Sequence, residues 1–76
     1  MIFNINNKKV NIDDKLLKMH ETYMYEILNE NDILYYLKGE ARVLNKNIKN
    51  CNETEMKSMI ESALRKDLNL RGIIYE

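Results

Sequence analysis

Residues 16–48 read LLKMHETYMYEILNENDILYYLKGEARVLNKNI, and a repeating stripe of mainly apolar positions runs along this stretch at alternating spacings of four and three. This spacing places the side chains on one side of a helix, which needs an apolar surface to pack against. Only His20 and Glu30 are polar in the stripe, and Glu30 lies in residues 29–32, NEND, which favour caps and turns. The pattern predicts one long helix or two helices that fold back at residues 29–32. The stripe consists of Leu16, His20, Tyr23, Ile27, Glu30, Leu34, Leu37, Ala41, Leu44 and Ile48.

The residues before this stretch predict a β-hairpin. Residues 2–5 and 9–12 alternate largely apolar and polar side chains around Asn6-Asn7, and asparagine tolerates the positive φ of a two-residue type I′ loop. With this loop, Phe3 faces Val10, and one face of the hairpin is almost entirely apolar. A shift of one residue would mix the two faces.

Three helices are expected after the hairpin. The first begins at Asp13 or Asp14, which can cap it, and runs to about Asn29. The second runs from about Asp32 to about Lys46, with Ile33 at the margin of its apolar side. The third begins with a capping box in residues 52–55 and ends around residues 68–69. Its apolar stripe is Met56, Met59, Ile60, Ala63, Leu64 and Leu68.

These elements predict an α+β fold in one small domain spanning residues 1–76. Gly72 interrupts the segment that follows the third helix, and Ile73-Ile74-Tyr75 is β-branched and aromatic, so we expect a short C-terminal strand beside the hairpin. The expected order is β-β-α-α-α-β, a small antiparallel sheet packed against three helices.

The composition limits the classes of function. The twelve basic and twelve acidic side chains cancel, whereas nucleic-acid and anionic-membrane binders usually carry a basic excess. The single cysteine excludes an internal disulfide, and no run approaches the roughly 18 apolar residues of a membrane span. We therefore expect a cytoplasmic protein without membrane contact. The abundance of Asn, Lys and Ile, with AT-rich codons, favours an origin in an AT-rich bacterium or its phages and mobile elements.

Catalytic and metal chemistry find little support in the sequence. His20 and Cys51 are single residues of their types, too few for a structural zinc site. Asp13-Asp14 and the acids at residues 53 and 55 are better explained as helix caps, and no phosphate-binding glycine motif is present. The sequence predicts a non-enzymatic protein without a cofactor or metal.

Protein recognition is the leading hypothesis. Tyr36 and Val43 share a face of the second helix that lies more than about 90° from the apolar stripe, with Gly39 beside it. Either the second helix is covered on two sides by its own domain, or this face binds another molecule. Exposed tyrosines favour an interface. The predicted interface residues are Tyr25, Tyr35, Tyr36, Gly39 and Val43.

The alternative is a small, dimeric DNA-binding regulator in which residues 32–68 form a helix-turn-helix-like pair. Glu61 lies between the cations of the third helix, and acids crowd its N-terminus, where they would repel phosphates. The predicted contacts for this alternative are Lys46, Lys49, Lys57, Arg65 and Lys66.

The favoured function is thus steric docking on another protein, as a phage or mobile-element accessory protein that inhibits or organises a host protein would do. The same face could also form a homodimer. A chain of this length buries only a limited core, so self-association would help to stabilise it.

Overall fold

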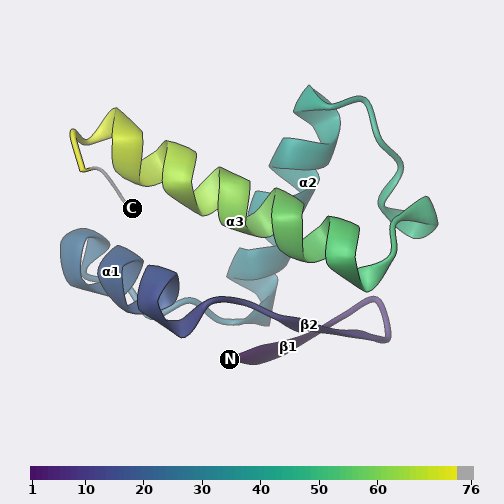
Figure 1. The fold of residues 1–76 in the computed structure, drawn as a ribbon, viewed down its shortest axis with the longest axis horizontal. Helices are drawn as coiled ribbons and strands as arrows, with labels where there is room; N and C mark the ends of the chain where they lie inside the picture. Colours follow the sequence, from purple (N-terminus) through teal and green to yellow (C-terminus); the bar gives the residue numbers. More distant parts are fainter. Residues whose placement is uncertain (74–76) are drawn as a thin grey trace.

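A computed structural model describes residues 1–73. α3 runs along the length of the molecule and crosses α2 (Figure 1). α1 and the β-hairpin lie one after the other beside α3. This arrangement confirms an α+β fold with an antiparallel hairpin and three α-helices. In chain order the elements are β1 (Ile2–Ile5), β2 (Lys8–Asn11), α1 (Asp14–Met24), α2 (Glu30–Val43), the 3₁₀ helix η1 (Ile48–Asn50) and α3 (Glu53–Leu70).

The hairpin has the predicted register. Phe3 pairs with Val10, and the loop residues Asn6 and Asn7 have φ angles of 51° and 65°, as a type I′ turn requires. The apolar face is buried against the helices at Phe3, Ile5, Val10 and Ile12. The sheet differs from the prediction in its third strand. Ile73 packs on the core but belongs to no strand, and residues 74–76 lie outside the described residues.

α1 is shorter than predicted. It begins after the N-cap Asp13 but ends at Met24 instead of continuing to Asn29, because Tyr25 adopts the left-handed conformation with a φ of 55°. Residues 25–29 then lead to α2, and Leu28 in this segment is buried. The apolar stripe is therefore divided between two helices, and the break begins four residues before the expected turn.

α2 begins earlier and ends earlier than predicted. Asn29 and Asp32 form a capping box that starts the helix at Glu30. At the other end, Asn45 has a φ of 55°, and the N–H groups of Asn45 and Lys46 bond to the carbonyls of Arg42 and Ala41. This pattern is a Schellman motif, and it ends the helix at Val43 instead of at Lys46.

The buried side of α2 is also rotated from the predicted stripe. Ile33 is fully buried and not marginal, Leu37 and Ala41 are buried with it, and Leu44 remains 47% exposed. The reason is that α2 packs against both β1 and α3, and these neighbours together cover a side centred on Ile33 and Leu37.

α3 supplies the largest share of the core. The predicted capping box of Asn52 and Glu55 is present, and the helix ends at Leu70 in a second Schellman motif with Gly72 at a φ of 78°. Each large apolar side chain that is fully buried stabilises the fold by about 1.5–3 kcal/mol. The buried apolar residues of α3 are Met56, Met59, Ile60, Leu64 and Leu68.

Candidate functional site

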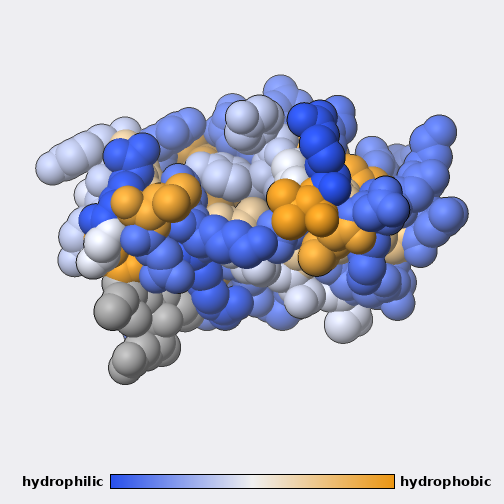
Figure 2. Space-filling model, turned by 90° about the horizontal axis from the view of Figure 1, so that it is seen from above, coloured by the Kyte–Doolittle hydropathy of each residue, from blue (hydrophilic) through white to orange (hydrophobic). Residues whose placement is uncertain are grey.

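An open groove of about 380 Å³ lies between α2 and the C-terminal half of α3. It contains four of the five predicted interface residues, Tyr35, Tyr36, Gly39 and Val43. α3 adds Leu70, which the sequence analysis missed because the helix was expected to stop before it. Seen from above, the molecule exposes hydrophobic side chains in patches on a mostly hydrophilic face (Figure 2).

The walls of the groove carry unusually exposed apolar side chains. Tyr35 is 76% exposed, Val43 71% and Leu70 86%. The α2 side of the groove is open at Gly39, because a Cβ atom built there would meet no other atom within 4 Å. Glycine inside a helix costs about 1 kcal/mol relative to alanine. Close packing within the described chain does not account for this glycine.

A hydrogen-bonded cluster of three side chains fixes the wall of the groove. The Tyr36 hydroxyl donates to Oδ2 of Asp67 at 2.9 Å, and the same oxygen lies 2.8 Å from Nε2 of His20. The Tyr36 ring meets both His20 and Tyr35 edge to face. The cluster joins α1, α2 and α3, so contacts with two other helices hold Tyr36 in place.

The cluster perturbs the acidity of two of its members. Burial, together with the hydrogen bond to Asp67, raises the pKa of Tyr36 well above its usual range. Burial by itself would raise the pKa of Asp67, but the hydrogen bonds from His20 and Tyr36 outweigh it and lower that pKa. The second imidazole nitrogen of His20, Nδ1, is buried without a hydrogen-bond partner in residues 1–73. The Tyr36 hydroxyl and Nε2 of His20 thus share a single carboxylate oxygen of Asp67, which links the three helices, while Nδ1 of His20 is left unsatisfied among the described residues.

The groove is lined by one ion pair and by two further cations. Nζ of Lys66 lies 2.9 Å from both oxygens of Glu40, which is buried, and this bond lowers the pKa of Glu40 despite its burial. Lys38 and Arg42 also line the groove, one turn apart on α2, and neither pairs with a carboxylate among the described residues. The groove therefore combines apolar walls with two unpaired cations on α2.

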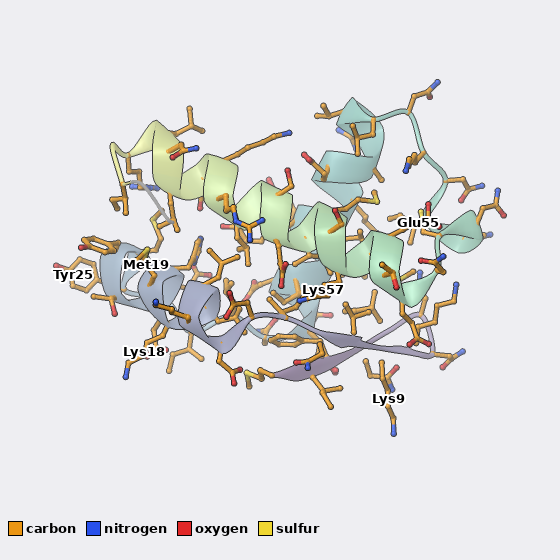
Figure 3. All side chains as sticks on the ribbon, viewed as in Figure 1. Lys9, Lys18, Met19, Tyr25, Glu55 and Lys57 are labelled. Atoms are coloured by element: carbon orange, nitrogen blue, oxygen red, sulfur yellow. The ribbon has the colours of Figure 1, made fainter. Side chains whose placement is uncertain are left out.

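Tyr25 lies away from the other predicted interface residues. It is 94% exposed at the C-terminal end of α1, where its side chain points outward (Figure 3). It does not line the groove between α2 and α3. The predicted interface is therefore continuous on α2 only.

The residues predicted for nucleic-acid contact fall into separate places. Lys57 and Arg65 both lie against Glu61 on α3, and Lys66 of α3 forms an ion pair with Glu40 of α2. Lys46 and Lys49 lie beyond the C-terminal end of α2, in a different depression. The structure does not bring these five cations together on one surface.

No known protein family, curated protein or solved structure matches this chain. Within residues 1–73, no helix has the length and apolar character needed to cross a membrane. The same residues contain no group of three or more His, Cys, Asp or Glu side chains placed to hold a metal ion. The geometry of the groove is thus the basis for a functional proposal.

Proposed function

We propose that this chain is a protein-binding module whose α2–α3 groove receives an amphipathic helix of another protein. The observation that carries the proposal is Gly39, an open glycine inside α2 that lies among the exposed side chains of Tyr35, Val43 and Leu70. Docking of a helix on such a surface would cover these apolar groups and use the space above the glycine.

The shape of the groove favours a helix as the ligand. The small residues Gly39 and Ala63 lie on its two sides, so a third helix could approach both backbones closely. Tyr35 and Val43 are eight residues apart, which corresponds to about 12 Å along the axis of α2. A partner helix of two to three turns would span this distance with apolar side chains at positions i, i+3, i+4 and i+7.

The charges indicate the chemistry of the partner. Lys38 and Arg42 have no carboxylate partner in the described chain and lie beside the apolar walls. A helix with Glu or Asp next to its apolar face would complement them, and such complementarity increases specificity and the rate of association. The proposed ligand is therefore an acidic amphipathic helix, and the chain would act sterically, by covering it.

Site-specific photocrosslinking in the source cells tests this proposal. A benzophenone amino acid replaces Val43 in the groove, and a matched control carries it at Lys18, which is exposed on α1 away from the groove (Figure 3). We expect a discrete crosslink from position 43 and not from position 18. Peptide mapping should place the crosslink in an acidic amphipathic helix of the partner.

A second comparison tests whether the captured partner uses the groove. Val43→Ser and Leu70→Ser should each weaken binding of the purified partner at least fivefold. Ile27→Ser, at a residue that is 76% exposed outside the groove, should change binding less than twofold. Equal crosslinking from both positions, a crosslink only between copies of this chain, or equal losses with Ile27→Ser would refute the proposal.

A further inference from the structure

A second and larger depression, of about 620 Å³, lies beside the C-terminal end of α2. Four cationic side chains line it, those of Lys38, Arg42, Lys46 and Lys49, and no carboxylate does. The hairpin turn and η1 lie at this end of the molecule, and α1 lies at the opposite end (Figure 1). The depression is thus a basic surface whose four cations come from residues 38–49, with Asn6 of the hairpin turn beside them.

The chain is electrically polarised although its net charge is zero. Residues 38–49 contain four cations and one acid, Glu40, which is buried and bound to Lys66. Residues 13–32 contain six acids and two lysines. A basic excess that the overall composition hides is therefore concentrated around the depression, and it creates a local positive potential.

The local backbone keeps this surface compatible with an anion. Free carbonyls at the C-terminal end of a helix repel negative charge. Here the carbonyls of Ala41 and Arg42 accept hydrogen bonds from Lys46 and Asn45 in the Schellman motif. Asn47 accepts a hydrogen bond from the backbone of Lys49 and so fixes the position of that residue. Two of the terminal carbonyl groups are thus hydrogen-bonded within the chain and not free to face an anion, and the backbone that carries Lys46 and Lys49 is itself hydrogen-bonded.

Most of these cations are available for a ligand. Nζ of Lys46 lies 3.5 Å from Glu55, and both side chains are substantially exposed, so this ion pair is weak. Lys38, Arg42 and Lys49 pair with no carboxylate among residues 1–73. The amides of Asn6, Asn45 and Asn47 add neutral hydrogen-bonding groups to the same surface.

We propose that this depression binds the phosphate backbone of a nucleic acid. Lysine, arginine and asparagine side chains all donate hydrogen bonds to phosphate oxygens. Lys38 and Arg42 lie about 6 Å apart along α2, close to the advance of two nucleotides along one strand of a duplex. An acidic protein fits less well, because the lining contains no aromatic side chain and only Ala41 and Ile48 as apolar residues. Lys38 and Arg42 line both this depression and the α2–α3 groove, so the two ligands would compete for them, whereas Lys46 and Lys49 line the depression and not the groove.

Fluorescence anisotropy with a labelled 20-base-pair duplex tests the proposal. Contact with three to four phosphates should make log K fall with log salt concentration at a slope of about −3 between 50 and 200 mM. Lys46→Glu with Lys49→Glu should reduce the steepness of that slope by about 2 and weaken binding at 50 mM at least tenfold. Neither residue lines the α2–α3 groove, so this result is separate from the test of protein docking.

The matched control is Lys15→Glu with Lys18→Glu on α1, which changes the net charge equally at the other end of the molecule. It should weaken binding less than threefold. Circular dichroism of both double variants checks that they fold. If Lys46→Glu with Lys49→Glu does not fold, Lys46→Ala with Lys49→Ala takes its place. Absence of binding at 50 mM, or equal losses with both pairs, would overturn the proposal. Binding of a 20-residue polyglutamate as tight as that of the duplex would also overturn it, in favour of an acidic protein.

Discussion

Replacement of Gly39 by alanine should stabilise the protein. The residue lies inside α2, it is exposed, and a Cβ atom built there meets nothing within 4 Å. Alanine therefore gains helix propensity without a clash, and the free energy of unfolding should rise by about 1 kcal/mol. For a domain of this size, that corresponds to an increase in Tm of roughly 4–8 °C. The gain comes partly from the smaller conformational entropy of the unfolded chain.

The assay is thermal and urea unfolding followed by far-UV circular dichroism. Lys38→Ala is the control, since Lys38 is exposed on the same helix and lysine and alanine differ by only a few tenths of a kcal/mol in helix propensity. Gly39→Leu adds a side chain to the groove, and it should keep the fold but weaken binding of the crosslinked partner at least tenfold. Destabilisation by Gly39→Ala would show that the fold itself needs the glycine, and the inference that the position serves a ligand would then fail.

Three further predictions concern the Tyr36–Asp67–His20 cluster and the end of α1. Because the pKa of Tyr36 is raised on folding, the unfolded chain ionises first, so stability should fall as the pH rises above about 10, the ordinary value for tyrosine. Urea titrations at pH 8–11 should show a weaker alkaline loss in Tyr36→Phe, and an identical loss would contradict the cluster. Asp67 has a lowered pKa, so its contribution is present above about pH 4 and lost below it. Asp67→Asn should cost about 1–2 kcal/mol at pH 7 and lose less stability than wild type between pH 5 and pH 2 in the same assay. Tyr25→Gly should raise the free energy of unfolding by about 1 kcal/mol, because Tyr25 is 94% exposed and left-handed, and a lower urea midpoint would refute this explanation.

Local chemistry made much of the fold predictable from the sequence. The positive φ angles of Asn6 and Asn7 determine the hairpin register, and the capping box that begins with Asn52 starts α3, so both elements follow from adjacent residues. The end of α1 could not be predicted in this way. Tyr25 has no intrinsic preference for the left-handed conformation, and the helix ends there because the chain turns to bury Leu28.

In the α2–α3 groove and the basic depression, too, features set by neighbouring residues were predictable and features set by long-range contacts were not. The shared helix face of Tyr36 and Val43 follows from helical periodicity, so most of the α2 side of the groove was predictable, although Tyr36 is partly buried against the core. Asp67 and Leu70 were not, because they join the groove only where α3 crosses α2. The four cations of the basic depression lie close together in the sequence, within residues 38–49, whereas no pattern in the sequence indicates that Asn6 of the hairpin turn joins them.

Two exposed residues make this small domain less stable than it would be with more favourable residues at the same positions. Gly39 lowers helix stability, and Tyr25 holds a left-handed backbone that glycine or asparagine would adopt with less strain. Packing in the described chain does not offset the cost at Gly39, which faces open space, whereas the turn at Tyr25 allows Leu28 to be buried although the Tyr25 side chain itself is 94% exposed. Strained or unfavourable positions persist in proteins where they serve function. For Gly39 the proposed function is docking, because it lies in the groove between α2 and α3, whereas Tyr25 lies outside that groove. Substitution of Tyr25 should therefore leave partner binding unchanged, while substitution of Gly39 by leucine should not.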